Sequence, residues 1–197
     1  MTVSKPVKYT LMSCLLFGLN AHAVSPNKAS LLANACAGCH GPNGSSQGPA
    51  TPSIAEMSPV YFIESMSAFK TDERPATVMN RIAKGYTKEQ IKLMADFFYS
   101  QKMLRTEQLT DPAMASLGEK LHAANCEKCH AKGGRESADD SGLLAGQKIP
   151  YLRYTIQDIL NGDRAVSRKM FKRLSSIHDE LDSDGIEQLL HYYGSQK

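Results

Sequence analysis

Hydrophobic residues recur with a helical period at two places far apart in the chain. The first stripe is Ile91, Met94, Ala95 and Phe98, and the second is Ile186, Leu189, Leu190 and Tyr193, both at positions i, i+3, i+4 and i+7. This spacing places the apolar side chains on one face of an α-helix. Thr87 and Gln90, which precede the first stripe, have the spacing of a capping box. Each stripe therefore predicts an amphipathic helix that closes a folded unit.

Other helix-start signals lie upstream of each stripe. Ser25-Pro26 and Asp111-Pro112 each place an N-cap residue before a proline at the first helical position. A middle helix is predicted near residues 59–69 and again near residues 150–160. No segment alternates apolar and polar residues as a half-buried strand does. The pattern predicts an all-α fold.

The helical pattern belongs to a duplication. Cys36-Ala-Gly-Cys39-His40 and Cys126-Glu-Lys-Cys129-His130 are 126 − 36 = 90 residues apart, and Tyr61 and Arg74 match Tyr151 and Arg164 at the same offset. The closing stripes match at an offset of 186 − 91 = 95, so the second copy is longer by about five residues, most of them near residues 175–184. We predict one domain over residues 24–103 and a second over residues 104–197, divided in a polar stretch near residues 101–108.

The first residues resemble an export signal. Lys5 and Lys8 precede an apolar run at residues 9–19, and Ala21-His22-Ala23 follows. This order predicts a signal peptide over residues 1–23 and a periplasmic mature protein. A membrane anchor is the alternative, but the run is shorter than the roughly 20 residues that span a bilayer. We therefore expect no membrane span in the mature chain.

Removal of that segment changes the charge and the cysteine count. The mature chain keeps 23 − 2 = 21 basic residues against 20 acidic ones, a net charge of +1. Such a charge predicts no partner, and nucleic acid is not expected. Cys14 is lost with the signal, so every remaining cysteine belongs to one of the two motifs.

Each Cys-x-x-Cys-His motif is typical of covalent haem attachment. The two thiols are close enough to reach both vinyl groups of one haem, and the adjacent histidine, His40 or His130, lies under the iron. A structural zinc site needs four ligands with paired spacing, whereas each motif supplies three. We expect two covalently bound haem c groups, attached through Cys36 and Cys39 and through Cys126 and Cys129.

The sixth iron ligand is expected downstream in the same copy. Met170 is the only methionine after His130. In the first copy Met79 alone matches Met170 in position, while Met94 lies on the apolar stripe. His178 or His191 is the competing ligand for the second iron. Filled His/Met sites leave no position for a substrate, which favours electron transfer over catalysis at the iron.

Three further features concern the surroundings of the haems. Gly48-Pro49 is expected to offer the backbone carbonyl that orients the proximal histidine, and Asp139 stands at the equivalent place in the second copy. The matched Tyr61, Tyr151, Arg74 and Arg164 either bind haem propionates or pack half-buried, and both interpretations are open. The basic residues around Met170 are either a solvated face or a docking site; they are Arg164, Arg168, Lys169, Lys172 and Arg173.

The mature chain resembles the dihaem cytochrome subunit of flavocytochrome c sulfide dehydrogenase over about residues 34–196. Beyond the haem motifs, the resemblance rests on Gly48-Pro-Ala-Thr-Pro-Ser-Ile-Ala55, Arg81-Ile-Ala-Lys-Gly-Tyr86, Leu144-Ala-Gly-Gln147 and Lys169-Met170. It implies two tandem class I-like cytochrome c domains, with iron ligands His40 and Met79 in the first and His130 and Met170 in the second.

The same resemblance implies a partner. In that family the cytochrome subunit forms a heterodimer with an FAD-containing flavoprotein, which oxidises sulfide, and passes the electrons to an external acceptor. This chain has no flavin-binding glycine fingerprint, so catalysis is expected in the partner chain. A free dihaem shuttle to a terminal oxidase is the alternative. A dihaem enzyme with a cysteine ligand is disfavoured, because the mature chain has no cysteine to spare.

Overall fold

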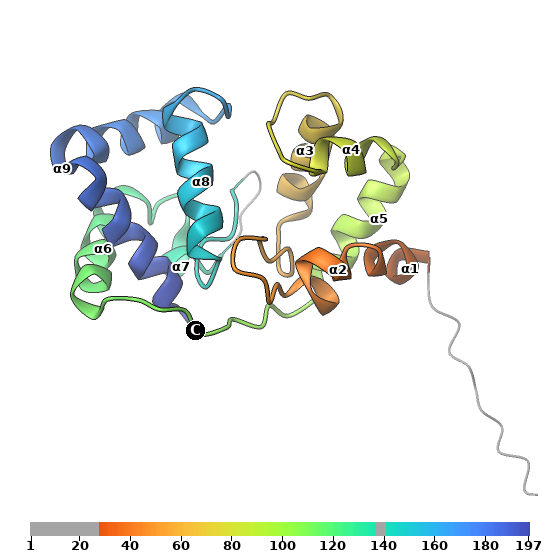
Figure 1. The fold of residues 1–197 in the computed structure, drawn as a ribbon, viewed down its shortest axis with the longest axis horizontal. Coiled ribbons are helices and arrows are strands. Elements are labelled where there is room, and N and C mark those ends of the chain that lie inside the picture. Colours follow the sequence, from red (N-terminus) through yellow and green to blue (C-terminus); the bar gives the residue numbers. More distant parts are fainter. Residues whose placement is uncertain (1–27, 137–140) are drawn as a thin grey trace, which may run out of the picture.

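The computed structural model describes residues 28–136 and 141–197. These residues form helices and loops without a strand, as the pattern predicts. Two helical lobes lie side by side, joined by an extended segment (Figure 1). The predicted signal peptide and the Ser25-Pro26 cap lie outside the described residues, as does Asp139. Within the described part of the chain, no helix combines the length and apolar character of a bilayer-spanning segment.

The first lobe packs its helices around the first apolar stripe. Its elements are α1 (Lys28–Asn34), α2 (Ala37–His40), the 3-10 turn η1 (Pro42–Gly44), α3 (Pro59–Lys70), α4 (Met79–Lys84) and α5 (Lys88–Tyr99). The capping box at Thr87 and Gln90 forms as predicted and starts α5. Met94 and Phe98 are buried in the core, where Phe98 contacts the rings of Phe62 and Phe97. The predicted stripe is therefore the centre of this lobe.

The second lobe repeats the arrangement, with one long helix in place of α4 and α5. It contains α6 (Pro112–Asn125), α7 (Ala131–Gly134), α8 (Ile149–Leu160) and α9 (Arg168–Ser195). Asp111 caps α6 as predicted, because its carboxylate accepts the N–H groups of Ala113 and Met114. The helix α9 corresponds to α4 and α5 together and breaks at Asp182, where φ is 53° and ψ is −146°. The residues gained by the second copy thus lie inside this long helix.

The backbone shows the duplication directly. Gly44 and Gly134, 134 − 44 = 90 residues apart, both have φ of +82°. The carbonyl of each accepts two consecutive N–H groups, those of Ile54 and Ala55 in one copy and those at the matched positions in the other. A Cβ on Gly44 would stand 2.8 Å from the ring of Phe98. Only glycine combines this left-handed conformation with so close an approach.

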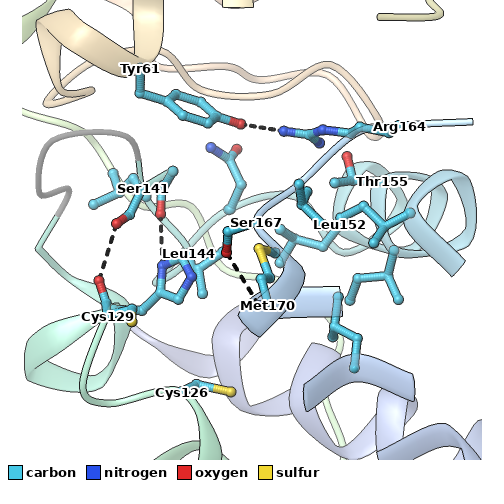
Figure 2. Close-up of a pocket in the computed structure, with 18 of the residues that line it drawn as sticks. Tyr61, Cys126, Cys129, Ser141, Leu144, Leu152, Thr155, Arg164, Ser167 and Met170 are labelled. Atoms are coloured by element: carbon cyan, nitrogen blue, oxygen red, sulfur yellow. Dashed lines mark hydrogen bonds between the residues drawn. The ribbon is translucent and has the colours of Figure 1, made fainter. Parts of the chain in front are cut away.

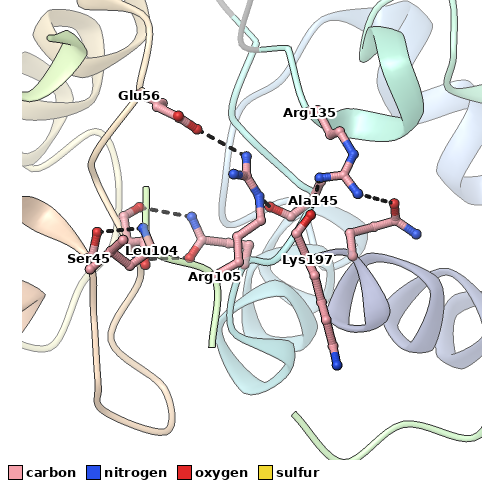
Figure 3. Close-up of polar contacts among 10 residues, drawn as sticks. Ser45, Glu56, Leu104, Arg105, Arg135, Ala145 and Lys197 are labelled. Carbon is pink, nitrogen blue, oxygen red and sulfur yellow. Dashed lines mark hydrogen bonds and ion pairs between the residues drawn. The ribbon is translucent and has the colours of Figure 1, made fainter. Parts of the chain in front are cut away.

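The connecting segment packs against both lobes. The N–H of Leu104 donates to Ser45 Oγ at 2.9 Å in the first lobe. Arg105 bridges the lobes, with Nη2 on Glu56 at 3.0 Å and Nε on the carbonyl of Ala145 at 3.3 Å (Figure 3). Met103 is buried with one residue of each lobe, Ala55 and Leu143. The linker therefore fixes the orientation of the lobes rather than tethering them loosely.

Candidate functional site

The first Cys-x-x-Cys-His motif forms a tight helical turn. The N–H of His40 donates to the carbonyl of Cys36 at 2.9 Å, which places both sulfurs and the imidazole within one turn. Cys36 is partly buried against the core that also contacts Met79, whereas Cys39 is exposed. Burial lowers the pKa of His40, and a bond to a backbone carbonyl opposes it. The neutral ring that burial favours is the form that binds iron.

The acceptor for His40 differs from the sequence expectation. Its Nδ1–H donates to the carbonyl of Pro52 at 2.8 Å, so the prediction of Gly48-Pro49 was wrong. In the second lobe His130 Nδ1 lies 3.3 Å from the carbonyl of Gly142. These two carbonyls occupy matched positions, because 142 − 52 = 90. After His40 the chain turns at Gly44 and returns to it, because the Gly44 carbonyl accepts the N–H groups of Ile54 and Ala55. This return brings the Pro52 carbonyl, rather than Gly48-Pro49, to the histidine.

A cavity of about 480 Å³ opens beside the second motif. Cys126, Cys129, His130 and Met170 all line it, although Met170 comes from α9, 170 − 130 = 40 residues after the histidine. The N–H of Met170 donates to the N-cap Ser167 Oγ at 3.2 Å, which holds this first turn of α9 at the cavity wall (Figure 2). Neither His178 nor His191 lines the cavity, and the imidazole of His191 accepts the N–H of Asp111.

The cavity reaches the boundary between the lobes, where the matched tyrosines and arginines meet. Arg164 donates from Nη2 to the hydroxyl of Tyr61 at 2.6 Å (Figure 2), and Arg74 donates from Nη2 to the hydroxyl of Tyr151 at 3.2 Å. Each arginine thus pairs with the tyrosine of the other lobe. Burial raises the pKa of Tyr151, but the positive charges of Arg74 and Arg164 and hydrogen bonds to Thr155 and Arg74 outweigh burial and lower the pKa to about 8. The crossing of these pairs was not predicted from the sequence.

One buried nitrogen in this region has no partner among the described residues. Arg164 Nη1 is buried and makes no hydrogen bond there, although Arg164 also lines the cavity. An unpaired buried guanidinium nitrogen is costly, so its position suits an anionic group in the cavity. A haem carries two carboxylates on its propionates, and apolar side chains such as Leu152, Ile156 and Leu174 line the rest of the cavity. The residues present therefore fit a haem.

Two buried polar groups were missed by the sequence analysis. His122 of α6 is 2% exposed, with Nδ1 2.9 Å from the Tyr193 hydroxyl and Nε2 2.6 Å from the carboxylate of Glu127. Glu127 lies between the two cysteines of the second motif and also accepts the N–H groups of Lys132 and Gly133. The second group is Gln147, which is 1% exposed and bonds across the lobes. Most hydrogen-bond partners of His122 and Gln147 lie far away in the sequence, and only Glu127 is near. No local sequence pattern therefore indicated that these two side chains are buried and bonded.

Comparison with known proteins places these features in a family. The Cytochrome c family model matches residues 28–111. The cytochrome subunit of sulfide dehydrogenase from Chlorobaculum tepidum is 44% identical over 75 residues, which cover 38% of this chain and 67% of that protein. Cytochrome c4 from Pseudomonas aeruginosa is 28% identical over 193 residues, covering 92% of this chain and 94% of that protein.

Solved structures agree with the fold. Reduced recombinant cytochrome c4 from Pseudomonas stutzeri superposes with a TM-score of 0.74 at 23% identity, over 87% of this chain and 100% of that one. The helical lobes and the predicted all-α duplication match this architecture of two cytochrome c domains. The chain therefore belongs to the cytochrome c family: it is an electron-transfer protein with two cytochrome c domains and two covalently bound haem c groups.

Proposed function

We propose that this chain is the periplasmic electron-transfer subunit of a sulfide-oxidising flavoenzyme. It accepts electrons from an FAD-containing flavoprotein and passes them through its two haems to an external acceptor, while catalysis occurs in the partner chain. The 44% identity with a cytochrome subunit of sulfide dehydrogenase is the observation that carries the proposal. The two exposed aliphatic side chains beside Met79, Val78 and Ile82, also support it.

The proposal includes the iron ligands. Cys36, Cys39 and His40 hold the first haem with Met79 as the sixth ligand, and Cys126, Cys129 and His130 hold the second with Met170. The shared cavity of His130 and Met170 supports the second set. The first set is supported by the core that Cys36 and Met79 both contact. When bound, each haem supplies a one-electron couple, and a thioether ligand raises its potential relative to two histidines.

The surfaces beside the two methionines differ in chemistry. Beside Met79, the N-cap residue Val78 and Ile82 of α4 are 47% and 43% exposed, and the exposed basic residues Arg81 and Lys84 flank them. In α9, next to Met170, the exposed residues are Arg168, Lys169, Phe171, Lys172 and Arg173. Both surfaces are mixed, but aliphatic side chains make up more of the first and basic side chains more of the second. Exposed apolar side chains suit a lasting partner, whereas a denser cluster of exposed charge suits rapid encounters with a soluble acceptor. We therefore assign the flavoprotein to the first domain and the acceptor to the second.

The test is purification of the tagged protein from its native periplasm. The proposal expects a second, larger chain with flavin absorbance in the same fraction. The double variant Val78→Glu/Ile82→Glu should lose that chain, while Leu117→Glu should keep it, because Leu117 is 44% exposed but lies on α6 of the other domain. Loss of the flavoprotein with Leu117→Glu alone, or its absence from the unaltered protein, would contradict the proposal.

A free dihaem shuttle to a terminal oxidase is the second candidate. The 28% identity with a cytochrome c4 over 92% of the chain favours it. A shuttle needs no lasting interface, so it should elute as a monomer from the periplasmic extract on a sizing column. Elution at the combined mass of two different chains would contradict this alternative.

A further inference from the structure

The side-chain amide of Gln147, in the second domain, makes two hydrogen bonds to the backbone of one residue of the first domain. Its Oε1 accepts the N–H of Ser53 at 2.8 Å, and its Nε2 donates to the carbonyl of Ser53 at 2.9 Å. Gln147 is 1% exposed and Ser53 is 1% exposed, so both bonds lie away from water. Two bonds from one rigid amide plane fix the position and the orientation of the Ser53 backbone.

The Ser53 backbone that Gln147 holds is directly bonded to the residue whose carbonyl accepts the hydrogen bond from His40. Pro52, whose carbonyl accepts His40 Nδ1–H at 2.8 Å, directly precedes Ser53. The Pro52 carbonyl belongs to the same peptide group as the Ser53 N–H that Gln147 holds. Because a peptide group is planar, a bond to the N–H sets the direction of the carbonyl. Gln147 therefore acts on His40 through one peptide unit.

The duplication supplies an internal comparison. The position matched to Gln147 in the first copy is Met57, because 147 − 90 = 57, and a thioether cannot hold a peptide group in this way. In the second domain the corresponding bond, from His130 to the carbonyl of Gly142, is longer at 3.3 Å. The shorter bond thus occurs where the amide is present, and the longer one where methionine replaces it.

We propose that Gln147 is a positioning residue for the first haem, which keeps its reduction potential lower than it would be without this contact. A stronger bond from Nδ1–H to a carbonyl gives the ring more anionic character, and a more basic ligand stabilises ferric iron. Electrons then leave the first haem for the second more readily. The proposal rests on the assignment of His40 as an iron ligand, and it assigns a residue of the second domain to the redox chemistry of the first.

The test is Gln147→Met in the purified holoprotein, which installs the residue of the first copy. The reduction equilibrium of the first haem should shift toward the ferrous form by up to about tenfold, because a less basic imidazole stabilises ferric iron less. A tenfold shift equals about 59 mV for one electron. In spectroelectrochemistry the potential of the first haem should rise by more than that of the second haem, whose cavity Gln147 also lines. In ¹⁵N-histidine NMR spectra, the Nδ1–H of His40 should exchange faster with solvent, and that of His130 should not.

Arg105→Met is the matched control, because it removes another bond between the lobes without touching Ser53 or Pro52. It should leave the first haem unchanged. Gln147→Asn, too short to reach both groups of Ser53, should shift the potential in the same direction and serves if the methionine variant folds poorly. Equal shifts in the Arg105 and Gln147 variants, or no shift in the first haem, would overturn the proposal. A His40 signal without a hyperfine shift in the oxidised parent protein would instead contradict the ligand assignment.

Discussion

Replacement of Tyr61 by phenylalanine should measurably weaken the contact between the domains. The hydroxyl of Tyr61 accepts a bond from Arg164 Nη2 at 2.6 Å, and Arg164 Nη1 already lacks a partner among the described residues. Hydrogen bonds to charged groups contribute about 1.5–3 kcal/mol. We expect Tyr61→Phe to lower the free energy of unfolding by about 2 kcal/mol, which corresponds to a fall in Tm of about 4–8 °C for a chain of this length.

Urea unfolding followed by circular dichroism measures this change. Tyr154→Phe is the control, because Tyr154 is 60% exposed on α8, and surface changes are usually within about 0.5 kcal/mol. A double-mutant cycle with Arg164→Met tests the pair itself: the double variant should lose little more than Arg164→Met alone. Equal destabilisation by Tyr61→Phe and Tyr154→Phe, or fully additive losses in the cycle, would refute the reasoning.

Three further predictions concern the second domain. Met170→Ala should remove the sulfur-to-iron absorption band of one haem and keep that of the other, and a spectrum with both bands intact would show that Met170 is not a ligand. Because the pKa of Tyr151 is about 8 in the folded state and that of an unfolded tyrosine is about 10, its contribution to stability should grow between pH 8 and pH 10 and be absent below pH 8. Tyrosinate absorbance should show an ionisation near pH 8 that Tyr151→Phe removes, and its survival in that variant would assign it elsewhere. Lys172→Glu should slow electron transfer to ferricyanide at low salt several-fold and have little effect at high salt, because the Debye length falls from about 30 Å at 0.01 M to about 3 Å at 1 M. Lys88→Glu, in the first turn of α5, should change this rate little, and an equal effect of both variants would exclude a role for the α9 surface.

Local patterns predicted most of the helices. The capping box of Thr87 and Gln90, the Asp111-Pro112 start of α6 and the buried stripe of α5 are all present as expected. These signals depend on residues within one or two turns of one another, so the chain carries them without reference to the rest of the fold. The dividing point at residues 103 and 104 stays a prediction, and Met103 packs between the two domains.

The acceptor of the proximal histidine shows the limit of such patterns. Expectation placed it at Gly48-Pro49, and the structure places it at Pro52. The choice depends on how the loop after the motif folds over the glycine turn at Gly44, whose carbonyl accepts the N–H groups of Ile54 and Ala55. No short sequence motif predicts that the chain comes back to Gly44 in this way.

By itself, the sequence determined the helices, the duplication and the two haem attachment motifs, because periodicity, capping and thiol spacing are all local properties. Only the tertiary structure decided which groups cross between the copies. Arg164 meets Tyr61 across 103 residues, and Gln147 meets Ser53 across 94. Such contacts depend on the relative placement of two packed domains, which follows from the sum of many weak interactions along their boundary rather than from any single stretch of residues.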